Sequence, residues 1–309
     1  MGLLDEIQKK AAAAAESKRG RMSQEEKMKK YFVALLGKNE TKATRRIRIL
    51  PSVGTEDVFQ VGYFHKVNIK GYGRAKLYDP GRNDGAPSPL NDVAKRLRSL
   101  SPEQLKEASF TKEEANKAAR EYDPSKFYIV RVIDRDNEAD GVKFWRFAHS
   151  SKGDGVFDQL VAVIESRGEI NDPDQGRDLT ITLGLQTNGA ISWTGVVGII
   201  PEDKSPLHEN PEVAKAWIED PITWRDVYSA KPIEYLQIVA NGETPKWSSE
   251  LGKFVPHSEM NSNGSSTFGG STTTEQEFVP RFDSDVKNTS THQASSVVTD
   301  DEPDEDLPF

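Results

Sequence analysis

Cysteine is absent from the 309 residues, which excludes disulfides, thiolate zinc sites and a cysteine nucleophile. Long apolar runs are also absent, and no stretch approaches the roughly 18 residues that a membrane-spanning helix requires. The first residues, Met-Gly-Leu-Leu-Asp, become charged too early for a secretory signal. Apolar residues make up 35% of the chain, enough for one large or two small globular domains. We therefore expect a cytoplasmic protein with no membrane partner.

Positive charge is in deficit overall, because 41 Lys and Arg face 49 Asp and Glu, for a net charge of -8. This total argues at first against a nucleic-acid ligand. Residues 1–100, however, carry 21 basic and 11 acidic side chains, whereas the other 209 residues carry 20 and 38. Such an asymmetry is typical of a basic surface joined to an acidic tail, each with its own partner.

The pattern along the chain predicts four regions. Residues 1–40 read as a basic helical arm, with Ser23 and Glu26 forming a capping box before an apolar stripe that runs to Leu36. Residues 41–255 carry the core, with strands expected near 41–50, 58–70, 126–135, 142–149, 177–186 and 191–200, and a helix over 156–166. Residues 71–90 read as a long loop, and 211–239 as helical. Ser, Thr, Asn and Gly dominate 256–299, a disordered linker that precedes an acidic tip at 300–309.

Enzyme signatures are weak. Asp134, Asp136, Glu138 and Asp140 alternate, but an EF-hand loop begun at Asp136 would need a bidentate Glu where Phe147 stands, so a polar turn explains the acids better. The five histidines have no zinc spacing, and no P-loop, dinucleotide fingerprint or nucleophile elbow occurs. We expect no enzyme and no metal site. A magnesium-dependent nuclease or other replication enzyme built from dispersed carboxylates remains the alternative.

Basic and aromatic residues interleave through the strand region. Single-stranded nucleic acid requires this mixture, because cations neutralise phosphates and rings stack on bases. Phe64 shares a face with Lys66 and Lys70. Trp145 and Phe147 share a face with Lys143, whereas Arg146 points the other way, and one of these two faces should bind. Phe59, Tyr63, Phe127 and Phe144 are expected in the core. The candidate DNA-binding residues are Arg46, Arg48, Phe64, Lys66, Lys70, Tyr72, Arg74, Lys76, Tyr78, Arg131, Arg135, Lys143, Trp145, Arg146 and Phe147.

The C-terminal tip is the most specific local signal. Six of its ten residues are acidic, and it ends in Leu-Pro-Phe. A solubilising tail has no need of an apolar end, so we expect a docking peptide whose Phe ring and carboxylate enter a basic-rimmed pocket on a partner. Its docking residues are Asp304, Glu305, Asp306, Leu307, Pro308 and Phe309. An adaptor that uses this tip without binding DNA is a third hypothesis.

Two stretches carry a resemblance to a known family. They are Ile47-Arg48-Ile49-Leu50-Pro51-Ser52, and the strand pair Ile129–Arg135 and Lys143-Phe144-Trp145-Arg146-Phe147 followed by the helix with Phe157 and Ile164. Together with the arm, linker and tail they resemble the T-even phage helix-destabilising, single-stranded DNA-binding proteins. The final Asp-Leu-Pro-Phe resembles the tip of the bacterial single-stranded DNA-binding proteins.

The resemblance implies an α+β, mainly β chain with an OB-fold core, a five-stranded barrel with helical insertions. It implies that the protein coats single-stranded DNA without sequence specificity at the replication fork of a viral host cell, in replication, recombination and repair. The basic arm, through Lys18, Arg19 and Arg21, would mediate self-association along DNA, and the acidic tail would recruit replication proteins. Phage relatives often hold a zinc with one His and three Cys. Here His65 lies near the expected His but no Cys follows, so we expect no zinc and no other cofactor.

Overall fold

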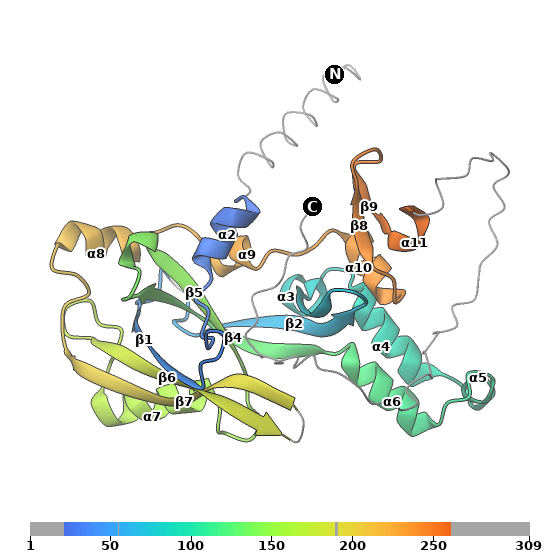
Figure 1. The fold of residues 1–309 in the computed structure, drawn as a ribbon, viewed down its shortest axis with the longest axis horizontal. Helices are drawn as coiled ribbons and strands as arrows, with labels where there is room; N and C mark the ends of the chain where they lie inside the picture. The colour runs from blue at the N-terminus through green and yellow to red at the C-terminus, as the bar shows by residue number, and fades with distance from the viewer. Residues whose placement is uncertain (1–21, 55, 189–190, 261–309) are drawn as a thin grey trace, which may run out of the picture.

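The computed structural model describes residues 22–54, 56–188 and 191–260 (Figure 1). The predictions for Lys18, Arg19 and Arg21, and for the linker and tip beyond residue 260, lie outside these residues. The strands are β1 (Lys42–Ile49), β2 (Gln60–Ile69), β3 (Gly73–Tyr78), β4 (Pro124–Asp134), β5 (Val142–Ala148), β6 (Arg177–Asn188), β7 (Ile191–Lys204), β8 (Pro245–Ser248) and β9 (Lys253–Pro256).

The helices lie between and after these strands. They are α2 (Gln24–Lys30), α3 (Pro80–Asp84), α4 (Pro89–Ser99), α5 (Pro102–Glu107), α6 (Lys112–Glu121), the 3-10 turn η1 (Glu138–Asp140), α7 (Val156–Arg167), α8 (Pro211–Ile218), α9 (Trp224–Val227), α10 (Ile233–Ala240) and α11 (His257–Met260). None of the described helices is long and apolar enough to cross a membrane.

The strand predictions and the capping box of Ser23 and Glu26 are confirmed. The expected strands correspond to β1, β2, β4, β5, β6 and β7. Ser23 and Glu26 exchange hydrogen bonds at the start of α2, and Thr111 and Glu114 do so at the start of α6. The prediction of a helix through Leu36 was wrong, because α2 ends at Lys30 and Phe32 instead donates its N–H to the carbonyl of Phe144 at 2.9 Å. The 71–90 segment is not a loop, since it contains β3 and α3.

The chain is a mixed α/β protein built on a mostly antiparallel sheet. The sheet runs β3-β2-β4-β1-β6-β7, with β5 on the other edge of β4. One edge of β4 pairs with β2 through Gln60 opposite Ile129, and then with β1 through Ile47 opposite Asp134. The sheet is not closed into a barrel. Figure 1 shows β2 and β4 running from the group of β1, β6, β7 and α7 to the group of α4 and α6.

Separate helices cover two parts of the sheet. α7 inserts Leu160 and Val163 among the buried residues of β1, β4, β5 and β6. At the other end, α4, α6 and α10 pack against Val67, Ile69 and Leu77 of the β2–β3 hairpin. Leu90, Val93 and Leu97 are buried in this second cluster, and Leu100 packs against it. The sheet therefore has a covered region at each end of β2.

Candidate nucleic-acid interface

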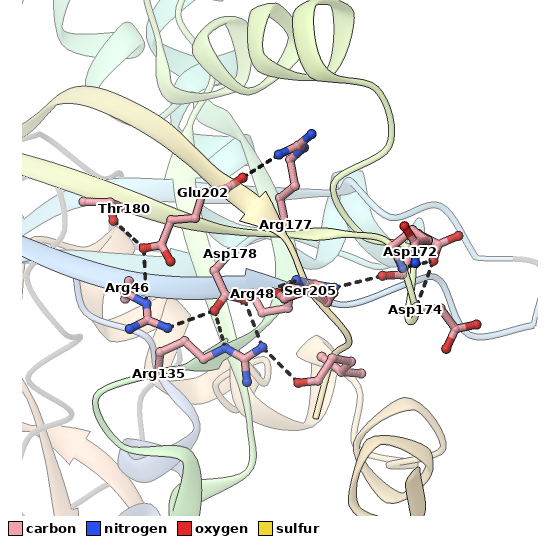
Figure 2. A network of polar contacts seen from close by, with 12 residues as sticks. Arg46, Arg48, Arg135, Asp172, Asp174, Arg177, Asp178, Thr180, Glu202 and Ser205 are labelled. Carbon is pink, nitrogen blue, oxygen red and sulfur yellow. Dashed lines mark hydrogen bonds and ion pairs between the residues drawn. The ribbon is translucent and has the colours of Figure 1, made fainter. Parts of the chain in front are cut away.

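Three of the predicted phosphate contacts are instead bound by one carboxylate (Figure 2). The β1–β6 register sets Ile47 opposite Leu179, which brings Arg48 beside Asp178. Asp178 accepts hydrogen bonds from Arg46 at 3.2 Å, Arg48 at 3.3 Å and Arg135 at 2.9 Å. Burial lowers the pKa of Arg48, whereas the bond to Asp178 raises the pKa of Arg46. We call these four residues the arginine network.

Arg48 also donates to two backbone oxygens. Its Nη2 donates to the carbonyl of Asp172 at 3.0 Å and to that of Ser205 at 2.8 Å, and its side chain is completely buried. The neighbouring open cleft has a volume of about 1000 Å³. Its wall carries more carboxylates than cations, namely Glu138, Asp178, Glu202, Asp203 and Glu209 against Arg46, Arg135 and Lys204. This charge balance repels phosphates, so the prediction that Arg48 and Arg135 contact DNA is corrected to a structural role.

A buried aromatic cluster contains three more candidates. Phe64 is 1% exposed and Tyr78 5% exposed. The Arg146 guanidinium lies 4.5 Å from the Phe64 ring centroid and 4.4 Å from that of Tyr228. α9 and the residue after α2 cover this face through Trp224 and Tyr31. The solvent-facing position predicted for Phe64 was wrong, because the second face of β2 is covered as well.

Five more strand candidates are also buried. Arg131 donates to the carbonyls of Trp217, Ile218 and Asp220 at 2.8–3.2 Å. Lys143 pairs with Asp134 at 3.0 Å and Asp140 at 2.8 Å. The side chains of Lys76, Trp145 and Phe147 are buried too. Neither proposed face of β5 is therefore open: α7 covers the face of Trp145 and Phe147, and the aromatic cluster covers that of Arg146.

The candidates that reach the surface lie mainly on the β2–β3 hairpin. Lys70 and Arg74 are exposed, and Lys66 and Tyr72 are half-buried. Lys66 lies opposite Lys76 in the register and 5.3 Å from the Phe127 ring centroid. Arg46 is half exposed despite its bonds to Asp178 and Glu202. The β2–β3 hairpin therefore carries most of the candidate residues that are accessible to solvent.

Between the two covered regions the sheet exposes a band that we call the uncovered strip. Tyr63 faces Lys126 across β2 and β4, and Val61 faces Tyr128. Cross-strand partners lie on one face of a sheet, here the face that α7 covers at one end and α4 and α6 at the other. The strip consists of Val61, Tyr63 and Lys126 at its centre, with Phe59, Arg82, Tyr128, His149 and Phe157 at its margins.

Rings and cations alternate along the uncovered strip. The Phe157 ring stacks on Tyr128 at 4.1 Å with an interplanar angle of 9°, and Phe59 meets Phe157 edge-on at 5.4 Å. Lys126 Nζ lies 4.6 Å from the Tyr128 ring centroid and donates to its hydroxyl at 3.1 Å. The Arg82 guanidinium lies 5.4 Å from the Tyr63 ring centroid. Val61 is 39% exposed, and Tyr63, Lys126, Phe59 and Phe157 are half-buried, so their outer surfaces face solvent.

A buried polar cluster fixes one margin of the uncovered strip. Asn83 of α3 accepts from the Tyr63 N–H at 2.9 Å and donates to its carbonyl at 2.8 Å. Asp79 caps α3 by accepting from the N–H groups of Gly81 and Arg82. Burial alone would raise the pKa of Asp79, but bonds from His65, Ser88 and Arg82 hold it below its usual value. These hydrogen bonds hold α3 in place, and α3 in turn positions Arg82 over the Tyr63 ring.

The same cluster does not fit a structural zinc ion. His65 Nε2 lies 3.1 Å from Asp79 Oδ1 and 3.4 Å from Ser88 Oγ. Structural zinc takes four nitrogen, sulfur or carboxylate ligands, and the pair of His65 and Asp79 supplies two. In the described part of the chain, no group of three or more His, Asp or Glu side chains is placed to hold a metal.

The uncovered strip was missed by reasoning from the sequence. Alternation along β2 assigned Tyr63 to the core with Val67 and Ile69. The three residues do share one face of the sheet, but the helices that bury Val67 and Ile69 leave Tyr63 half-buried. Lys126, two residues before Tyr128, was the available signal, because a cation and a ring at that spacing share one face. No protein-family model and no curated protein matches this sequence.

Proposed function

We propose that this chain binds single-stranded DNA with little sequence preference. The observation that carries the proposal is the uncovered strip, where Tyr63 and Phe157 expose ring surface beside Lys126 and Arg82. Stacking on a ring is open to every base, and each stack is worth about 1–3 kcal/mol. Nearby cations attract the backbone phosphates. Rings and charges side by side therefore suit an unpaired strand.

The remaining parts of the proposal come from the sequence. The resemblance to the phage helix-destabilising proteins supports an OB-type core, a role in viral replication, recombination and repair, and action at the replication fork without catalysis. The basic residues Lys18, Arg19 and Arg21 are proposed to mediate self-association. Residues 304–309 are proposed to recruit replication proteins. We propose that the tip can also compete with DNA for basic residues, because a tethered polyanion has a high local concentration.

A fluorescence titration with homopolymeric single strands at two salt concentrations tests the proposal. Affinity should fall steeply with salt and depend little on base composition. Binding that ignores salt, or no binding at all, would contradict it. Incubating labelled single strands with the protein and magnesium tests the nuclease alternative, because a binding protein leaves the strands intact.

A further inference from the structure

A second cluster of rings and cations lies where the tips of two hairpins meet. Thr244, just before β8, donates its hydroxyl to the carbonyl of Lys70 at 2.8 Å, which ties the β2–β3 turn to the β8–β9 hairpin. Across this junction Lys246 Nζ lies 4.9 Å from the ring centroid of Tyr72. Gly71 and Gly73 flank Tyr72 with φ angles of 82° and 85°, which glycine adopts readily, so the turn is compact.

Trp247 supplies an exposed ring at this junction. Among the described tryptophans, Trp145, Trp217 and Trp224 are buried and Trp193 is half-buried, whereas Trp247 is 40% exposed. Its ring meets Phe254 at 5.2 Å and 72°, and Phe254 meets Tyr235 of α10 at 5.1 Å and 89°. Tyr235 belongs to the buried cluster under α4 and α6. The exposed ring is therefore held by two rings that lead into the core.

The two chain segments that meet at the junction carry more cations than acids. Residues 68–74 and 243–256 contain four cations, Lys70, Arg74, Lys246 and Lys253, and two acids, Glu243 and Glu250. Lys70, Arg74 and Lys253 are exposed. Glu243 accepts a hydrogen bond from Ser258. By the β8–β9 register, Trp247 lies on one face of this hairpin and Lys246 and Lys253 on the other. An exposed indole and cations on one hairpin are complementary to a polyanion that carries stacking rings and can contact both faces.

From this geometry we infer that the junction of the β2–β3 and β8–β9 hairpins is a second contact for single-stranded nucleic acid, in which a base stacks on Trp247. We call it the hairpin junction. It lies beyond Ile69, six residues or about 20 Å along β2 from Tyr63. The inference rests on the proposed function and extends it, because a strand touching both places occupies more nucleotides than the uncovered strip alone.

Titration of full-length protein with long oligothymidylate tests this inference. Trp247→Ala should weaken binding about 5- to 150-fold, the range for one lost base stack. Leu251→Ala is the matched control, because Leu251 is 60% exposed in the turn of the same hairpin. The control should bind like the wild type. A Trp247→Ala variant that binds as tightly as Leu251→Ala would overturn the inference.

The Trp247→Phe variant shows whether weaker binding by Trp247→Ala comes from a lost stack or from a folding defect. This variant keeps a ring and should retain most of the affinity, but the quenching of tryptophan emission by DNA should fall sharply, because Trp247 is the indole placed to stack. Quenching equal to that of the wild type would overturn the inference. The two proposals fail differently: a wild type that binds no oligothymidylate refutes the proposed function, whereas a wild type that binds and a Trp247→Ala that binds equally well refute the hairpin junction alone.

Discussion

The arginine network and the uncovered strip contain similar cations with opposite fates. In the network, the Asp178 carboxylate of β6 pairs with Arg46, Arg48 and Arg135. The fully buried Arg48 also donates to the carbonyls of Asp172 and Ser205. In the strip, Lys126 lies over the buried ring of Tyr128, and Arg82 lies over the half-buried ring of Tyr63. A basic residue in a strand is thus a poor guide to a phosphate contact until its cross-strand neighbours are known.

The largest effect is expected from a substitution that removes the carboxylate of the arginine network. Asp178→Asn should lower the free energy of unfolding by about 3–5 kcal/mol, because buried arginines lose their counter-charge. Urea unfolding measures this loss. Glu202→Gln is the control, since its partner Arg46 is half exposed and such pairs are worth about 0–1 kcal/mol. A stable Asp178→Asn would show that backbone carbonyls alone satisfy Arg48.

The next largest effect is expected on single-strand affinity when a ring of the uncovered strip is removed. Tyr63→Ala should weaken single-strand binding by about 1–3 kcal/mol through the loss of one stacking ring. Tyr63→Phe keeps the ring and should bind like the wild type. A fluorescence anisotropy titration at fixed salt measures both. Equal affinity for Tyr63→Ala and the wild type would remove Tyr63 from the interface.

Salt dependence sharpens the comparison further. Lys126→Gln should reduce the slope of log affinity against log salt by about 0.7, the value of one single-strand phosphate contact. Arg46→Gln should leave the slope unchanged, because Arg46 is already paired with Asp178 and Glu202. Titrations over a salt series give both slopes. A larger change for Arg46→Gln than for Lys126→Gln would reverse the assignment of the two regions.

The smallest effect is a pH dependence at the margin of the uncovered strip. The folded protein holds the pKa of Asp79 below its ordinary 3.8, so Asp79 contributes stability above that pH. The contribution is lost as the pH falls below 3.8 towards the folded value. Asp79→Asn should therefore lose less stability than the wild type on acidification from pH 5 to about 3. Urea unfolding across this range measures the difference, and parallel curves for the two proteins would contradict it.

The elements were largely predictable, and the faces were not. Alternation along β2 and the capping pair at Ser23 are local signals, and the structure has the elements they predicted. Phe64 and Tyr63 show that local signals predict the face of a side chain but not its burial. Alternation separated the two residues correctly, yet the expected solvent face is buried under Trp224 and Tyr31, while the expected core face exposes part of Tyr63.

By itself, the sequence determined six of the strands, the start of α2, the basic first third and the acidic end, because each of these can be read from nearby residues. The tertiary structure decided which cations face solvent. Arg48 meets Asp178 across 130 residues, and Thr244 meets Lys70 across 174. Such pairings follow from strand register and helix placement, which a period of two does not specify. The uncovered strip and the hairpin junction exist because helices cover the sheet at some places and not at others.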